Sequence, residues 1–182
     1  MPATCHGVCL AFAWLVWAAA GMVPAWSLAQ DEPRHVSAAA RAFIAKGVAH
    51  VLTGCSDPMP PKRCPHGRRL KASPVQTLPD SNGGPPFTFQ TIAYAGMTMT
   101  YRAGDVVELT VSSPAWPVLH NLRVGAPFSR VSARLGEPMA LQDGATAAEQ
   151  IALYCRNEDC ATFSIDRRAG RVTSITWSFY YD

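Results

Sequence analysis

Apolar residues recur with a helical period over residues 34–52, which predicts an amphipathic helix in this segment. Arg41, Lys46 and His50 fall mostly off the apolar stripe. The stripe consists of Val36, Ala40, Phe43, Ile44, Gly47, Val48 and Val51. Gly54 follows at a position well suited to end the helix.

Short runs rich in Thr, Val and aromatic residues begin at Phe87 and predict strands. They cover residues 87–94, 97–102 and 106–112. The second gap reads Ala-Gly-Asp, which is a strong hairpin-turn signal. We therefore expect a three-stranded meander after the first helix.

A second, shorter helix is predicted over residues 127–135. Pro127 suits the first turn of a helix, and Gly136 suits its end. The apolar face of this helix consists of Phe128, Val131 and Leu135.

Three further strands are predicted in the C-terminal part, at residues 150–155, 161–166 and 172–181. In the last of them apolar and polar residues alternate, as in a strand with one buried face. The order helix, three strands, helix, three strands predicts an α+β fold. We expect two helix-plus-three-strand units whose helices pack on one antiparallel sheet of about six strands.

The N-terminal segment differs from the rest of the chain in composition. Residues 8–22 are uninterruptedly apolar, and residues 1–29 contain no Lys, Arg, Asp or Glu. Small residues stand at the positions that a signal peptidase requires, so we predict a signal peptide over residues 1–29. An uncleaved anchor is the alternative, because no Lys or Arg precedes the apolar run. Cleavage before Gln30 would leave a single secreted domain over residues 30–182, without a stable membrane anchor.

Within this domain, residues 30–112 hold the first helix, a long loop and three strands, and residues 113–182 form the second unit. The loop covers residues 56–86 and is rich in proline. It carries a basic run that consists of Lys62, Arg63, His66, Arg68, Arg69 and Lys71. This run suits contact with an acidic protein face, peptidoglycan or anionic lipid head groups, and a solvated loop is the alternative.

Four of the six cysteines lie outside the predicted signal peptide. An even number in an oxidising compartment predicts disulfides. Local pairs are favoured, Cys55 with Cys64 and Cys155 with Cys160. Neither spacing is the two-residue knuckle of a zinc site, so we predict no metal.

Composition and charge narrow the function classes. A 182-residue chain with 48% hydrophobic and 16% charged residues is typical of one ordinary globular domain. The net charge of +3 is a small surplus, and without a visible motif it does not favour nucleic-acid binding.

The sequence contains no clear set of catalytic residues. The histidines at positions 35, 50, 66 and 120 are scattered, and Ser112, Ser113 and Ser129 lack the Gly-x-Ser-x-Gly context of an activated nucleophile. We expect no enzyme activity and no cofactor. A small hydrolase built on His120, Glu108 and Ser112 is the least favoured alternative.

Two phrases in the C-terminal part carry a family resemblance. Val-Gly before a short helix and Leu-Gly-Glu-Pro at its end span Leu122 to Pro138. A later phrase, Gly-Arg-Val-Thr-Ser-Ile, covers residues 170–175. Together they resemble the SmpA/OmlA (BamE) family of envelope proteins and the β-lactamase inhibitory protein fold, over about residues 121–178. The resemblance implies a short helix that leads into an antiparallel sheet and covers it.

The doubled layout is more similar to the inhibitory protein than to the lipoproteins, which carry a lipidated Cys where this chain has Gln30. We therefore predict a secreted or periplasmic, non-enzymatic protein-binding module, similar to an inhibitor or immunity protein. Its partner would be another envelope or secreted protein. An envelope-assembly accessory that resembles BamE is the alternative. The candidate partner-binding residues are Lys62, Arg63, Arg68, Arg69, Arg156, Asn157, Glu158, Trp116 and Tyr180.

Overall fold

The computed structural model describes residues 36–56, 60–79 and 83–180. The predicted signal peptide lies outside the described residues. The elements in chain order are α1 (Ala38–Val51), β1 (Arg69–Ala72), β2 (Gln76–Leu78), β3 (Phe87–Tyr94), β4 (Met97–Arg102), β5 (Asp105–Val111), the 3-10 helix η1 (Leu119–Asn121), α2 (Phe128–Leu135), β6 (Ala140–Asp143), β7 (Glu149–Arg156), β8 (Asp159–Asp166) and β9 (Arg171–Ser178).

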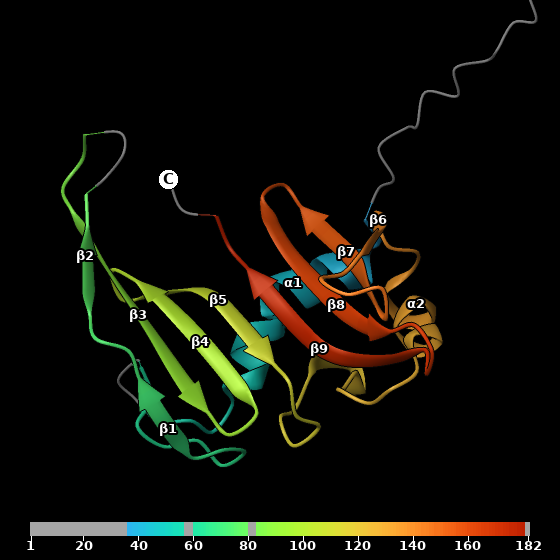
Figure 1. Ribbon diagram of the computed structural model, residues 1–182, viewed down its shortest axis with the longest axis horizontal. Helices are drawn as coiled ribbons and strands as arrows, with labels where there is room; N and C mark the ends of the chain where they lie inside the picture. Colours follow the sequence, from blue (N-terminus) through green and yellow to red (C-terminus); the bar gives the residue numbers. More distant parts are fainter. Residues whose placement is uncertain (1–35, 57–59, 80–82, 181–182) are drawn as a thin grey trace, which may run out of the picture. The chain divides into compact units, whose positions relative to one another are not determined.

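All described strands join one antiparallel sheet (Figure 1). Its strands follow the order β1, β3, β4, β5, β9, β8, β7, β6. β2 also pairs with β3, so β1 and β2 lie one after the other along the same strand. Residues 73–75, with Pro74 at their centre, separate them. This edge of the sheet is therefore interrupted.

Aromatic residues fasten α1 to the C-terminal half of the sheet. The ring of Phe43 stacks on Phe163 and on Trp177, with ring centroids 5.5 Å and 5.2 Å apart. Gly47 gives the indole of Trp177 its room, because a Cβ at this position would lie 2.3 Å from Trp177 Nε1. The helix thus lies behind β8 and β9 in Figure 1 and covers one face of the sheet.

The expected two helix-plus-three-strand units are wrong. The described residues form nine strands instead of about six, and only two α-helices accompany them. The main contacts of α1 are with β7, β8, β9, η1 and α2, although β3, β4 and β5 follow it in the chain. The reason is that Phe43 finds its aromatic partners more than a hundred residues downstream. Both helices therefore lie against the same half of the sheet.

The individual elements agree better with the sequence. Both predicted helices are confirmed as α1 and α2, and the six predicted strands as β3, β4, β5, β7, β8 and β9. The last strand ends at Ser178, before the predicted end at residue 181. Three short strands were not predicted: β1 and β2 lie within the expected long loop, and β6 follows the second helix. Among the described helices, none is long and apolar enough to cross a bilayer.

Candidate binding surfaces

Both predicted disulfides are confirmed. Cys55 bonds to Cys64, and Cys155 bonds to Cys160. The first bridge closes a short loop between α1 and β1, and the second joins β7 to β8 beside their turn. Such bridges persist in an oxidising compartment, so the two pairs are compatible with a secreted protein.

The predicted partner-binding residues do not form one surface. Arg69 begins β1 and pairs with Tyr94, the last residue of β3. The turn that carries Asn157 lies at the opposite end of the sheet, where Cys160 pairs with Ser178 (Figure 1). Six strand spacings of about 4.8 Å separate β1 from β7, which amounts to about 29 Å. The basic run and the hairpin turn are therefore separate candidate sites.

Trp116 has a structural position that the sequence did not indicate. Its side chain is only 1% exposed, and its indole nitrogen donates a hydrogen bond of 2.8 Å to the carbonyl oxygen of Ala95. The ring also lies against Gly67, where an added Cβ would be 2.7 Å from the indole. Trp116 thus supports the basic loop from within, and we remove it from the candidate contact residues. Tyr180, in contrast, is 59% exposed just after β9.

Residues 62–69 line a hollow of about 520 Å³, which we call the basic bowl. Its cationic side chains are those of Lys62, Arg63, Arg68 and Arg69. In the part of the chain that the structure describes, none of these cations forms an ion pair with a carboxylate. Residues 60–79 include no Asp or Glu. Among the described residues, the bowl therefore presents positive charge to solvent without an ion-paired carboxylate.

The wall of the basic bowl is held by several specific contacts. The backbone of Arg63 exchanges hydrogen bonds with Ser56: the Ser56 N–H donates to the Arg63 carbonyl at 2.8 Å, and the Arg63 N–H donates to the Ser56 hydroxyl at 3.1 Å. The hydroxyl of Tyr94 donates to the carbonyl of Pro61 at 2.6 Å. Burial raises the pKa of Tyr94, and nearby Arg69 partly opposes this shift. The phenol consequently stays neutral and keeps donating at neutral pH.

The sheet has a second face, opposite to the one that α1 covers, and this face is lined by hydroxyl side chains. Thr98, Thr110, Thr176 and Thr162 are register partners, one after the other, on β4, β5, β9 and β8. The hydroxyl oxygens of Thr110 and Thr176 lie 2.9 Å apart. The resulting row crosses four adjacent strands without a charged residue.

Two parallel rows extend this surface, and the shorter one consists of the register partners Ser164 and Ser174 on β8 and β9. Thr91 and Thr100 are register partners whose hydroxyl oxygens lie 3.2 Å apart. Their row continues through Glu108 to Ser178 and ends at the disulfide of β7 and β8. We define the hydroxyl face as the half-buried or exposed side chains of Thr91, Thr98, Thr100, Thr110, Thr162, Ser164, Ser174, Thr176 and Ser178. Sequence reasoning missed this face, although Thr alternates with buried residues throughout β4.

The hairpin turn after β7 stands next to the hydroxyl face. Arg156, Asn157 and Glu158 are all exposed, and Asn157 has a left-handed backbone with φ 56°. Arg156 and Asp159 close the ladder directly beside the disulfide. The charged turn is therefore held at the end of a hairpin that the disulfide between Cys155 and Cys160 closes.

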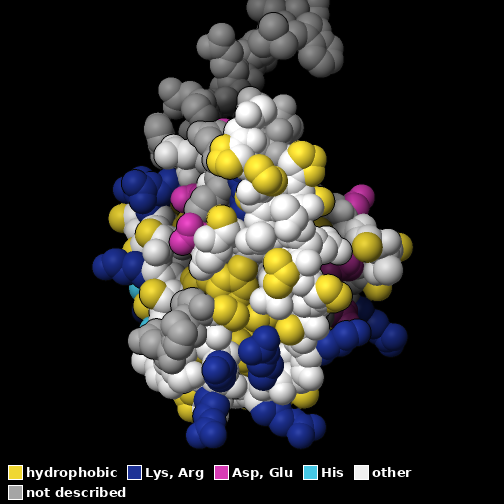
Figure 2. All heavy atoms as spheres, turned by 90° about the vertical axis from the view of Figure 1, so that its left-hand side faces the viewer, with side chains coloured by type: hydrophobic (Ala, Val, Ile, Leu, Met, Phe, Trp, Pro, Cys, Tyr) yellow, Lys and Arg dark blue, Asp and Glu magenta, His cyan; other side chains and the backbone are white. Residues whose placement is uncertain are grey.

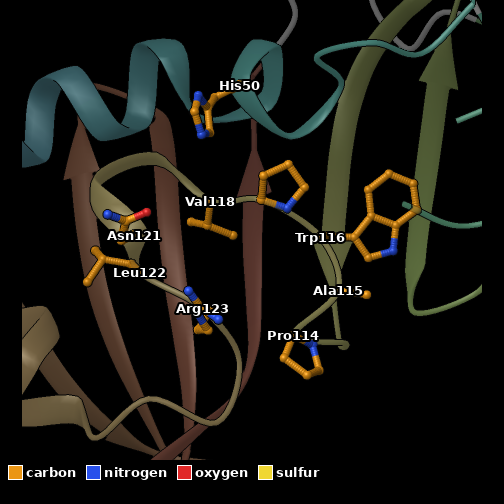
Figure 3. A pocket seen from close by; sticks show the side chains of 9 residues that line it. His50, Pro114, Ala115, Trp116, Val118, Asn121, Leu122 and Arg123 are labelled. Carbon is orange, nitrogen blue, oxygen red and sulfur yellow. The ribbon is translucent and has the colours of Figure 1, made fainter. Parts of the chain in front are cut away.

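A pocket of about 240 Å³ lies between α1 and the connection from β5 to α2. Figure 3 shows His50 projecting from α1 toward the connection that carries Val118, Asn121 and Arg123. His120 and Asn121 both have left-handed backbones, with φ 62° and 56°. No carboxylate or hydroxyl side chain lines this pocket, so it offers the His50 imidazole neither a nucleophile nor an orienting acid.

The alternative catalytic trio is not assembled either. Glu108 and Ser112 lie four residues apart along β5 and its end, which corresponds to about 13 Å in a strand. Within residues 36–56, 60–79 and 83–180, no group of three His, Cys, Asp or Glu side chains is placed to hold a metal ion.

Comparison with known proteins gives little further information. No protein-family model matches the chain, and no curated protein matches it. The chain is similar to a solved extracellular protein containing an SCP domain from Bacillus anthracis strain Ames, with a TM-score of 0.37 and 9% sequence identity. The match covers 57% of this chain and 38% of the other, so this chain spans much less than the length of that protein. At this TM-score the likeness assigns neither a fold nor a function.

Proposed function

We propose that this chain is a secreted or periplasmic, non-enzymatic protein-binding module that acts like an inhibitor or immunity protein. One observation carries the proposal: the threonine row of the hydroxyl face crosses four neighbouring strands in register. Both described helices lie on the other side of the sheet, as the contacts of Phe43 and Tyr154 indicate. The row is thus free of covering helices within the described residues.

The geometry suits recognition of a folded protein. Neighbouring strands place the hydroxyl groups about 4.8 Å apart on a rigid sheet, so little conformational freedom is lost on binding. Each hydroxyl both donates and accepts hydrogen bonds, which lets the face pair with backbone and polar groups of a partner. The charged tip at Arg156, Asn157 and Glu158 adjoins this face and would add orientation.

The resemblance to the BamE and inhibitory-protein group is part of the same proposal. In the described structure α2 leads into the strands β6 to β9, as the resemblance over residues 121–178 implies. The absence of enzyme activity is also part of the proposal. An envelope-assembly accessory would use the same face for a different partner.

Site-specific photo-crosslinking in the native periplasm tests the proposal. A crosslinking side chain is placed at Thr162 on the hydroxyl face, at Asn157 on the tip, or at Arg130 on the exposed side of α2 as the control. We expect one soluble protein to be captured in stoichiometric amount from Thr162 and Asn157, and not from Arg130. Capture of barrel-assembly or cell-wall components would favour the accessory role instead. Equal capture from all three positions would contradict a defined binding face.

A further inference from the structure

We infer that the basic bowl and the adjoining bulge at Leu70 form a second binding surface, which docks the protein reversibly on an anionic phospholipid membrane. This inference goes beyond the proposed protein-binding function, because it concerns the opposite end of the sheet and a different chemistry. It would leave the hydroxyl face available while the protein rests on the bilayer.

The charge of the segment that forms the bowl and the first two strands has a uniform sign. Residues 60–79 include five Lys and Arg and no Asp or Glu. Lys62, Arg63, Arg68 and Lys71 are exposed around the bowl and β1. Such a local cluster of positive charge is attracted to a layer of anionic head groups, and this attraction raises the concentration of protein near the layer.

An aliphatic side chain, that of Leu70, stands between these cations in the sequence of β1. The register between β1 and β3 shifts between Arg69 and Lys71, so Leu70 is the extra residue of a β-bulge. A bulge redirects a side chain, and Leu70 is 56% exposed. Val75, further along the same edge, is 59% exposed. Figure 2 shows Lys and Arg side chains gathered along the lower rim of this edge, with hydrophobic side chains exposed above them.

An aliphatic group flanked by cations is the composition of a surface that lies in the membrane interface. The apolar group enters the boundary between head groups and acyl chains, while the cations contact lipid phosphates. Neither of these two contacts depends on a groove or on a complementary protein shape. The basic bowl, with its hollow of about 520 Å³, can accept head groups around Cys64 and His66.

An extended acidic peptide added to this edge is a weaker alternative. β1 has four residues and β2 has three, and Pro74 stands between them. Proline has no backbone N–H, and short, interrupted edges that carry Lys do not template a further strand. The exposed side chains at this edge therefore suit a lipid surface better than strand pairing.

Flotation with lipid vesicles tests the inference. The full chain is purified after export, its intact mass is recorded, and it is mixed with vesicles of phosphatidylcholine, with or without phosphatidylglycerol. We expect flotation only with phosphatidylglycerol and release by added salt, since exposed charges are screened. Flotation with both lipids, or with neither, would overturn the inference.

Two matched pairs of variants separate the cations from the aliphatic group. The double variant Arg63→Gln, Arg68→Gln should lower the partition coefficient by about tenfold or more, because each cation near the surface contributes to attraction. Leu70→Ser should lower it several-fold at unchanged salt sensitivity. The controls are Arg130→Gln with Arg134→Gln on α2, and Leu141→Ser on β6, where the side chain is 51% exposed. Melting curves confirm that each variant is folded.

Two further outcomes would also contradict the membrane inference. If Leu70→Ser floats like the parent protein while the arginine variant does not, the bowl is a plain anion site and the membrane inference is wrong. If soluble polyglutamate displaces the protein from vesicles at low concentration, an acidic protein is the better ligand. Crosslinking from Thr162 reports on the hydroxyl face alone, so failure of that proposal is recognised independently.

Discussion

The indole nitrogen of Trp177 donates a hydrogen bond of 3.2 Å to the backbone carbonyl of Phe43, across 134 residues of sequence. The two rings also stack, with centroids 5.2 Å apart. A helix near the start of the described chain is thereby fixed to its last strand. This contact orients α1 on one face of the sheet and leaves the hydroxyl face on the other.

Replacement of Gly47 by Ala should destabilise the protein by about 2 kcal/mol, although Ala is normally the better helix former by about 1 kcal/mol. The added Cβ would lie 2.3 to 2.8 Å from three atoms of the Trp177 ring. Urea unfolding followed by tryptophan fluorescence measures the change. The control Ala49→Gly, at an exposed position of the same helix, should cost about 1 kcal/mol through helix propensity alone. Increased stability of the Gly47 variant would refute the close packing.

Replacement of Gly136 by Val should cost about 1 to 3 kcal/mol of stability. Gly136 follows α2 with φ 84° and ψ −174°, a backbone region that residues with a Cβ rarely adopt. Its N–H also caps the helix by donating to the Ser132 carbonyl at 2.8 Å. Ala133→Val, at an exposed position within the helix, is the control and should cost less than about 1 kcal/mol. Equal melting temperatures for the two variants would be inconsistent with this cap.

Loss of either disulfide should lower the free energy of unfolding by about 2 to 3 kcal/mol, from the entropy of closing loops of this length. The pairs are replaced by serine one at a time, Cys55 with Cys64 or Cys155 with Cys160. Only the second pair borders the hydroxyl face, so only its loss should also weaken capture of the partner by crosslinking at Thr162. An intact mass of the parent protein with no hydrogens lost would contradict both bridges, because each bridge removes two hydrogens.

Stability should fall when the pH rises above 10. Burial raises the pKa of Tyr154 well above its ordinary value of 10.0, and the charge of Glu137 adds to the shift. Burial likewise raises the pKa of Tyr101. Unfolding releases these phenols to ionise, so their contribution is complete below pH 10 and is lost as the pH rises toward the folded-state pKa.

Urea midpoints from about pH 9 to about pH 11 measure this dependence. Tyr154→Phe should flatten the curve, since it removes one of the titrating phenols. It should also lower stability at neutral pH by about 1 kcal/mol, because the hydrogen bond of 2.9 Å from Tyr154 to the Gly136 carbonyl is lost. An identical pH dependence in the variant would show that Tyr154 does not contribute.

The elements that the sequence predicted are those with one buried face. Buried and half-buried residues alternate through most of β8 and through β9 from Ser174 onward, and this burial is what produces a period of two. β2 is exposed throughout, and β6 is exposed in three of its four residues. An edge strand that buries no face leaves no periodic pattern, which is why β1, β2 and β6 were missed.

The arrangement of the elements was harder to predict than the elements themselves. The expected units grouped α1 with β3, β4 and β5, but the stacking of Phe43 on Phe163 and Trp177 places the helix on β8 and β9. The hydroxyl face depends in the same way on the register between β5 and β9, which joins Thr110 to Thr176. Periodicity within one strand does not encode such pairings. The disulfides were predictable because their cysteines are close in sequence.

The most direct test of the account is a threonine methyl NMR spectrum of the protein before and after addition of the partner recovered by crosslinking. We predict that the methyl signals of Thr98, Thr110 and Thr162 shift on binding, whereas those of Thr53 and Thr146, which lie outside the hydroxyl face, stay unchanged. The shifts should stop changing when one partner molecule has been added per chain. Binding that leaves the three face signals unmoved would contradict the hydroxyl face as the recognition surface.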